Sequence, residues 1–285
     1  MSDALNFKQE LTGVFGQPVA ENPSQVMMEA GYRAAGLAWR YLTIEVAPSD
    51  LGAAVRGARA MGFRGFNCTI PHKIAVIEHL DRLGESASIM GAVNCVVRRD
   101  DELVGENTDG KGFTESLRPI TDPEGTHVVI LGAGGAARAI ATELALAGAR
   151  ALTIVNRTES RGEDLAKLIE EKTDATARFI PWHGDYAVPE DADVLVNATS
   201  IGLYPDVDAR VAVAEESLRE SLVVADVIPN PPRTRLLRSA EERGCRTIDG
   251  LGMLVGQGVL GFRYWTGQDA DPVAMRQALE DVFGA

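Results

Sequence analysis

The chain has 285 residues, of which 45% are hydrophobic, so it is long enough for two domains with separate cores. Lys and Arg together number 28 and Asp and Glu number 41, which gives a formal charge of −13 at pH 7. This balance repels nucleic acid and anionic membranes and favours a protein that acts on small molecules.

Signals for a membrane, a leader or a metal are missing. No run is long and apolar enough to span a bilayer, and Met1–Glu10 lacks the apolar core of a signal peptide, so we expect a cytoplasmic protein. The three cysteines and four histidines have no metal-ligand or redox spacing, so we expect no metal. They are Cys68, Cys95, Cys245, His72, His79, His127 and His183.

The amino-terminal part alternates between strands and helices. A short strand is expected at Gly13–Gly16, a helix at 24–35 capped by Ser24, a strand at Trp39–Val46 and a small-residue helix that reaches about Met61. This order is typical of a parallel α/β sheet.

The stretch Asn67–Lys73 contains the first candidate site residue. A strand ends at about Ile70, and Pro71 occupies the place of a first helical residue in a helix that runs to about Leu83. Lys73 then lies in the first turn, where the helix dipole disfavours a cation, so it is a candidate for function rather than stability. The alternative is a solvated surface lysine. Asn67 and Thr69 share this strand end, where parallel α/β sheets place ligand-binding residues.

A predicted hairpin around Asp100–Asp101 leads to a second candidate, Asp109. Asp109 precedes a helix that reaches about Leu117, so it is either an N-cap or a site residue. Residues 119–125 read as a linker to a second domain.

That second domain begins with the stretch His127–Arg138, an apolar strand that enters a glycine turn and leaves as a helix. In the pattern G-x-G-x-x-(G/A), Gly132 permits the tight turn, Gly134 lets a diphosphate approach the backbone, and Ala137 lets the helix pack against the strand. The alternative is an ordinary turn built from small residues.

The next strand specifies the cofactor. It ends in Asn156-Arg157-Thr158, with Arg161 just beyond, about 20 residues after the glycines. An acidic residue at this point binds the ribose 2′-hydroxyl of NAD, whereas an arginine accommodates the 2′-phosphate of NADP. The sequence therefore predicts NADP(H), unless the arginines are only a solvated helix start.

These segments together resemble the shikimate dehydrogenase family over nearly the whole chain. The resemblance rests on Asn67–Lys73, Gly91–Asn94, Asn107–Gly110, the glycine turn, Asn156–Thr158, Asn197–Gly202 and Gly250–Gln257 in this order. It implies two α/β domains: a substrate-binding domain with a mostly parallel sheet, formed by residues 1–109 and 252–285, and a Rossmann NADP-binding domain of residues 110–251.

The resemblance also implies roles for individual residues. Lys73 and Asp109 would be the catalytic pair, with Lys73 exchanging a proton with the reacting oxygen while Asp109 orients the ammonium. The substrate would be held by Asn22, Ser24, Asn67, Thr69, Asn94 and Gln257, although Gln257 can also be read as a satisfied core amide. The cofactor would be bound by Gly132, Gly134, Gly135, Ala136, Asn156, Arg157, Thr158, Arg161, Thr199 and Gly250.

The expected carboxylate end of the substrate site departs from the family pattern. Where the family usually has His-Ser-x-Ser-Pro, with two serines that hold the shikimate carboxylate, this chain has Glu21-Asn22-Pro23-Ser24-Gln25. The tyrosine that usually helps there is replaced by Pro229. Asn22 can still donate hydrogen bonds, but Glu21 brings a negative charge towards an anionic group.

We therefore expect an NADP-dependent enzyme that reversibly reduces 3-dehydroshikimate to shikimate, as in aromatic amino-acid biosynthesis through chorismate. The alternatives are a paralogue that acts on quinate or another cyclic polyol altered at the carboxylate end, and a non-catalytic NADP(H)-binding regulator, which intact Lys73 and Asp109 disfavour. A monomer and a homodimer are both consistent with the sequence.

Overall fold

The computed structural model describes residues 7–284 and divides the chain into two compact units. Unit 1 consists of residues 1–107 and 258–279, and unit 2 of residues 108–257 and 280–285. The segment Met1–Glu10, which was assessed above for a signal peptide, lies mostly outside the described residues. Among the residues that are described, no helix is both long and apolar enough to cross a membrane.

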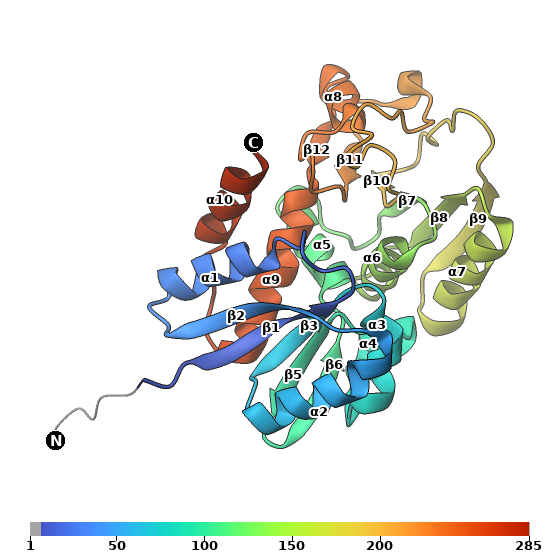
Figure 1. The fold of residues 1–285 in the computed structure, drawn as a ribbon. Coiled ribbons are helices and arrows are strands. Elements are labelled where there is room, and N and C mark those ends of the chain that lie inside the picture. The colour runs from blue at the N-terminus through green and yellow to red at the C-terminus, as the bar shows by residue number, and fades with distance from the viewer. Residues whose placement is uncertain (1–6, 285) are drawn as a thin grey trace. The chain divides into compact units, whose positions relative to one another are not determined.

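Unit 1 is built on a mixed six-stranded sheet (Figure 1). Its strands are β1 (Glu10–Gly16), β2 (Trp39–Glu45), β3 (Gly65–Cys68), β4 (Arg82–Leu83), β5 (Cys95–Arg99) and β6 (Glu102–Glu106), in the order β2-β1-β3-β5-β6-β4. The β1/β2, β1/β3 and β4/β6 pairs are parallel, and the β3/β5 and β5/β6 pairs are antiparallel. The predicted hairpin is the β5–β6 turn, where Asp100 has a φ of 55°.

Helices cover both faces of this sheet. They are α1 (Ser24–Ala34), α2 (Leu51–Met61), α3 (His72–Ala75), α4 (Glu85–Met90), most of α10 (Pro272–Phe283) and the second half of α9 (Gly250–Thr266). Phe15, Val55 and Phe66 belong to the core beneath α2. On the other face, the rings of Tyr32 in α1 and Phe262 in α9 lie 5.4 Å apart.

Unit 2 has a six-stranded sheet in which every pair is parallel. Its strands are β7 (His127–Leu131), β8 (Ala151–Asn156), β9 (Thr176–Pro181), β10 (Val194–Asn197), β11 (Val223–Asp226) and β12 (Arg246–Ile248), in the order β12-β11-β10-β7-β8-β9. This is the doubly wound order of a Rossmann fold, and its direction reverses between β7 and β10. Ligands of such sheets bind at the carboxyl ends of the strands beside this reversal.

The helices of unit 2 pack on a sheet whose strands are almost entirely apolar, as expected for parallel strands buried on both faces. They are α5 (Asp109–Leu117), α6 (Gly135–Leu146), α7 (Glu159–Lys172) and α8 (Arg235–Glu242). Side chains of α5, α6 and α7 share one core with Val128 and Ile130, whereas Leu236 and Leu237 of α8 pack with Val129 and Leu131 on the other face.

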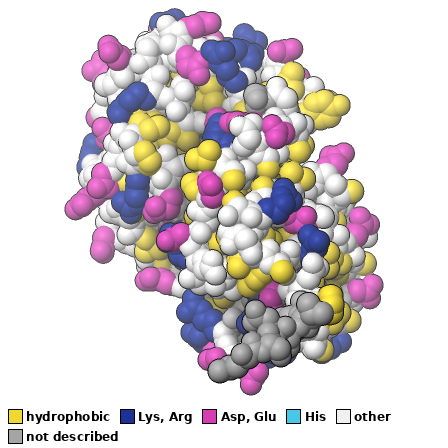
Figure 2. All heavy atoms as spheres, turned by 90° about the vertical axis from the view of Figure 1, so that its left-hand side faces the viewer, with side chains coloured by type: hydrophobic (Ala, Val, Ile, Leu, Met, Phe, Trp, Pro, Cys, Tyr) yellow, Lys and Arg dark blue, Asp and Glu magenta, His cyan; other side chains and the backbone are white. Residues whose placement is uncertain are grey.

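The surface reflects the acidic composition. On the face drawn in Figure 2, Lys and Arg side chains are interspersed with acidic and hydrophobic ones.

Candidate functional site

The polar residues predicted at the end of β3 form a hydrogen-bonded chain inside unit 1. The Tyr41 hydroxyl donates to Asn67 Oδ1 at 2.6 Å, and Asn67 Nδ2 donates to the Asn94 carbonyl oxygen at 2.9 Å. Asn67 and Asn94 are 8% and 4% exposed, and Tyr41 is fully buried. Because these bonds occupy Oδ1 and one Nδ2 hydrogen, Asn67 keeps one amide hydrogen to donate to a ligand. Tyr41, which fixes this orientation, was not predicted, since an aromatic residue in a strand is ordinarily core.

The loop before α1 differs in detail from its prediction. Ser24 is the first residue of α1 rather than its cap, and its N–H donates to Asn22 Oδ1 at 2.9 Å. The Asn22 side chain therefore forms the turn that leads into the helix. Ser24 is buried near the Tyr41 phenol, whose pKa is raised well above its usual range by burial, while a hydrogen bond with Ser24 opposes that rise. Glu21 is exposed.

Lys73 lies on a shorter helix than predicted. Helix α3 spans only His72–Ala75, and a 3₁₀ turn at 76–79 and strand β4 follow it, so the predicted helix to about Leu83 is wrong. Four residues make only a weak dipole, so the dipole argument for Lys73 loses most of its force. The segment is anchored instead by hydrogen bonds, from the Val93 N–H to the Lys73 carbonyl at 2.8 Å and between His72 Nε2 and the Val46 carbonyl at 2.8 Å.

Lys73 and Thr69 border the same strand end. Lys73 is half-buried, and its charge opposes the rise to about 12 that burial gives the pKa of the Cys68 thiol. This places the ammonium within electrostatic reach of the end of β3. The Thr69 N–H donates to the Phe15 carbonyl at 3.0 Å, which ties the strand end to β1.

In unit 2, Asp109 is the first residue of α5 and Thr108 is the N-cap, so the N-cap reading of Asp109 is wrong. A carboxylate in the first helical turn is favoured by the helix dipole. The helix is held close to its neighbours by glycines. A side chain at Gly110 would collide with the Ala139 carbonyl oxygen of α6, and one at Gly112 would collide with the backbone of Gln257. Asp109 thus lies on a closely packed helix.

The glycine turn has the geometry that a dinucleotide diphosphate requires. Gly132 follows β7 with a φ of 109°, and a Cβ there would lie 3.0 Å from the Ala198 carbonyl oxygen, so only glycine fits. Gly134 and Gly135 are exposed, and a Cβ on either would meet nothing within 4 Å. The first N–H groups of α6, which include that of Ala136, therefore face open space as an anion site needs.

The residues after β8 remain available for a ligand. Asn156 donates through Nδ2 to the Thr158 carbonyl at 2.8 Å, which shapes the turn before α7. Arg157 and Arg161 are exposed, and within residues 7–284 neither side chain makes a hydrogen bond or an ion pair. Two unpaired guanidinium groups at this strand end fit a 2′-phosphate.

Thr199, at the end of β10, belongs to a buried network that sequence reasoning missed. Its hydroxyl donates to Asn197 Oδ1 at 2.7 Å, and Asn197 Nδ2 donates to Asp226 Oδ1 at 3.0 Å. Asp226 also accepts from the Thr234 hydroxyl at 2.8 Å. Burial raises the pKa of Asp226 to about 6, while its hydrogen bonds oppose that rise. The network fixes the loops after β10 and β11, and the pairing of an aspartate with a distant asparagine leaves no local sequence signal.

The two residues predicted on α9 have packing roles in the structure. A Cβ at Gly250 would collide with the Ile228 carbonyl, so glycine is required for the approach of two backbone segments. Gln257 is 7% exposed and donates through Nε2 to the Leu254 carbonyl at 3.0 Å. Among residues 7–284, no three His, Cys, Asp or Glu side chains gather as a metal-binding group.

The fold and these strand-end residues define a two-unit α/β protein whose second unit has a dinucleotide-binding turn. Family models match three segments: the shikimate dehydrogenase substrate-binding domain at residues 14–96, shikimate/quinate 5-dehydrogenase at 116–241, and the shikimate 5-dehydrogenase C-terminal domain at 250–280. The chain belongs to the shikimate dehydrogenase family of oxidoreductases.

Individual relatives differ in their substrates. Shikimate dehydrogenase (NADP⁺) of Methanopyrus kandleri is 45% identical over 98% of both chains. The crystal structure of 5-ketofructose reductase of Gluconobacter sp. strain CHM43 is 54% identical, with a TM-score of 0.96, and covers 98% of this chain and 100% of its own. Shikimate 5-dehydrogenase of Thermus thermophilus, in complex with NADP(H) and shikimate, is 35% identical with a TM-score of 0.83, over 96% of this chain and 99% of its own.

Proposed function

We propose that the protein is an NADP-dependent reductase that transfers hydride to the ketone of a polyhydroxylated substrate without a carboxylate, such as 5-ketofructose. The Glu21–Gln25 loop carries this proposal, because it replaces the residues that the family resemblance assigns to the shikimate carboxylate. The 54% identity with a 5-ketofructose reductase over the full chain supports it.

The loop disfavours an anionic ligand for electrostatic reasons. Asn22 has an amide in place of a hydroxyl, and its carbonyl oxygen accepts from the Ser24 N–H. The Ser24 hydroxyl is buried near Tyr41, so the loop presents no free hydroxyl at its surface. Glu21 is exposed, so a carboxylate bound close to it would be repelled by a like charge that solvent partly screens. A neutral sugar hydroxyl avoids this repulsion and accepts a hydrogen bond from the Asn22 amide.

We propose that unit 2 holds NADP(H). The first turn of α6 at Gly134, Gly135 and Ala136 binds the diphosphate, and Gly132 shapes the turn. Arg157 and Arg161, with Asn156 and Thr158, bind the 2′-phosphate end, whereas Thr199 and Gly250 shape the loops around the cofactor. When bound, NADPH supplies the hydride that reduces the carbonyl carbon.

We propose that Lys73 donates the proton that the carbonyl oxygen needs as hydride arrives, and that Asp109 keeps the ammonium charged and oriented. Asn67, with its remaining amide hydrogen, and Thr69, Asn94 and Gln257 hold the hydroxyl groups of the substrate. A substrate that lacks these hydroxyls leaves buried polar groups unpaired, so this set selects polyols strongly. The assembly is a monomer or a homodimer.

Reduction of 3-dehydroshikimate to shikimate is the second candidate function, and oxidation of quinate is a variant of it. It is favoured by the relative that is named shikimate dehydrogenase and matches 98% of this chain. This reading requires Asn22 and Ser24 to hold a carboxylate despite Glu21.

Initial rates of NADPH oxidation with 5-ketofructose and with 3-dehydroshikimate distinguish the two functions. We expect kcat/KM for 5-ketofructose to be at least about tenfold higher, with NADPH preferred over NADH. A higher kcat/KM for 3-dehydroshikimate would instead establish the second function. Feeble turnover of both ketones, together with tight NADPH binding, would show that the substrate is another polyol.

A further inference from the structure

A cavity of about 280 Å³ opens on unit 2 where strands β7, β8 and β9 begin. The cavity lies at the amino-terminal ends of these strands, whereas the proposed cofactor-binding residues follow the carboxyl ends of strands in the same sheet. Its polar lining consists of His127, Arg150, Thr153, Thr176, Arg178 and Asp191.

The sheet topology explains why this cavity exists. The connection from β9 to β10 contains no helix, so a loop takes the place of the element that would cover β8 and β9 on this face. Thr153 pairs with Arg178 in the parallel register, and Ala151 pairs with Thr176. Since side chains two residues apart share a face, Thr176 and Arg178 of the edge strand both line the cavity with Thr153.

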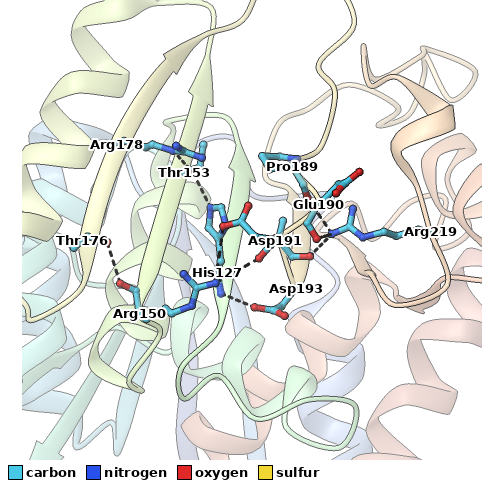
Figure 3. A network of polar contacts seen from close by, with 11 residues as sticks. His127, Arg150, Thr153, Thr176, Arg178, Pro189, Glu190, Asp191, Asp193 and Arg219 are labelled. Carbon is cyan, nitrogen blue, oxygen red and sulfur yellow. Dashed lines mark hydrogen bonds and ion pairs between the residues drawn. The ribbon is translucent and has the colours of Figure 1, made fainter.

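A chain of hydrogen bonds runs through the cavity wall (Figure 3). Arg178 Nε donates to Thr153 Oγ1 at 3.0 Å, and Thr153 Oγ1 lies 2.8 Å from His127 Nε2. His127 Nδ1 lies 3.0 Å from Asp191 Oδ2. Since a carboxylate only accepts, His127 carries a hydrogen on Nδ1, and its Nε2 shares a hydrogen bond with the Thr153 hydroxyl. This series of hydrogen bonds connects Arg178 Nε through Thr153 and His127 to Asp191.

Both arginines are exposed, and their terminal nitrogens make few contacts within the protein. Within residues 7–284, Arg178 makes no hydrogen bond through Nη1 or Nη2. Arg150 Nη2 reaches only the Asp191 carbonyl at 3.5 Å and Asp191 Oδ2 at 4.0 Å. Arg150 and Arg178 both line the cavity, and guanidinium groups with N–H donors left for a ligand bind oxyanions through charge-assisted hydrogen bonds.

We propose that this cavity is a second ligand site, which binds a small tetrahedral oxyanion through the guanidinium groups of Arg178 and Arg150. The ligand class is a phosphate, either free or as the monoester of a metabolite. A ligand bound there would link the edge strand β9 to β7 and β8. The site lies at the amino-terminal ends of these strands, whereas the proposed cofactor residues follow their carboxyl ends.

Titration of inorganic phosphate into the full-length protein, followed by ³¹P NMR at fixed ionic strength, tests the proposal. We expect saturable binding that Arg178→Gln weakens by at least about tenfold, whereas Arg243→Gln, which removes an exposed arginine away from the cavity, leaves it unchanged. Arg157→Gln removes an arginine proposed to bind the cofactor phosphate, and binding to the cavity should persist in this variant. Loss of binding in Arg157→Gln with retention in Arg178→Gln would put the anion on the cofactor arginines and overturn the proposal, as would equal binding by all variants.

Asp191→Asn is a second variant that keeps the acceptor for His127 but removes a negative charge at the rim. We expect it to bind phosphate about two- to fivefold more tightly, because like charge opposes the anion. Unchanged or weaker binding would contradict the proposal. The same titration with glycerol 3-phosphate identifies the source, since tighter binding of the monoester assigns a phosphorylated metabolite and tighter binding of inorganic phosphate assigns the free ion.

Discussion

The two units differ in how closely they follow the family resemblance. In unit 2, Gly132 has the required backbone conformation, Gly134 opens to solvent, and Arg157 is unpaired where a 2′-phosphate would bind. In unit 1, Asn67 and Lys73 lie at the end of β3 as the family pattern predicts. The sequence of the Glu21–Gln25 loop departs from that pattern. In this chain the residues proposed for hydride and proton transfer follow the family pattern, whereas those expected at the far end of the substrate do not.

This difference has a chemical reason. Every ketone reduced by NADPH needs the same hydride donor and a proton at the developing alkoxide, so the corresponding residues serve many substrates. The substituent at the far end of the substrate takes no part in the reaction, so the loop proposed to meet it can change with the substrate while the proposed catalytic pair stays the same. Four predictions test this separation, from the largest expected effect to the smallest.

Lys73→Ala should lower kcat by about 10²–10⁴ while the Kd for NADPH, measured by fluorescence titration, stays within about twofold. Loss of the proposed proton donor should affect only the reaction, since the residues proposed to bind NADPH belong to unit 2. Lys167→Ala removes a surface lysine that pairs with Glu171 and serves as the control. Unchanged turnover in Lys73→Ala would refute the catalytic assignment.

Asp226 should make unit 2 less stable as the pH rises from about 4 to about 6. Burial raises its pKa from 3.8 in the unfolded chain to about 6, so the native carboxyl binds its proton more tightly and loses that advantage across this window. A shift of about two units corresponds to about 3 kcal/mol. Carboxyl groups with lowered pKa values, such as Asp81 and Asp185, act in the opposite sense.

The pair of wild type and Asp226→Asn isolates this contribution, because the other carboxyl groups are common to both. Urea unfolding at pH 4.5 and pH 7 should show the variant gaining stability relative to wild type at the higher pH. A constant difference between the two proteins would contradict the pKa shift.

Arg157→Gln should raise KM for NADPH about tenfold and leave KM for NADH unchanged, because only the 2′-phosphate needs the guanidinium. Arg243→Gln is the matched control on the surface of the same unit. Equal effects on both cofactors would mean that Arg157 supports the loop rather than the phosphate.

Asn22→Ser should have the smallest effect, a rise of about two- to fivefold in kcat/KM for 3-dehydroshikimate relative to 5-ketofructose. Serine restores one hydroxyl of the family pattern and still accepts the Ser24 N–H, so α1 keeps its start. Glu21→Gln tests the charge separately and should act in the same direction. A fall in relative shikimate-type activity in both variants would exclude the loop as the specificity element.

Periodicity and turn residues predicted much of the fold, because these signals are local. The glycine turn after β7, the β5–β6 hairpin and the helix that begins at Ser24 all follow from neighbouring residues. The helix at Lys73 was predicted too long, since nothing near residue 75 announces the change to a 3₁₀ turn and then to β4.

Contacts between distant residues could not be predicted. Tyr41 meets Asn67 across 26 positions, and Asn197 meets Asp226 across 29, so neither pair has a sequence signature. The same holds for the chain from Arg178 through Thr153 to His127, which exists because a loop rather than a helix follows β9. Sequence patterns thus located the candidate site residues, whereas the groups that orient them required the structure.

A competition assay tests the central claim most directly, that the Glu21–Gln25 loop selects a ketone without a carboxylate. Equal concentrations of 5-ketofructose and 3-dehydroshikimate are supplied with limiting NADPH, so the product ratio equals the ratio of the two kcat/KM values. The account predicts that the reduced sugar exceeds shikimate by at least about tenfold. Shikimate as the main product would contradict it and would show that Asn22 and Ser24 hold a carboxylate beside Glu21.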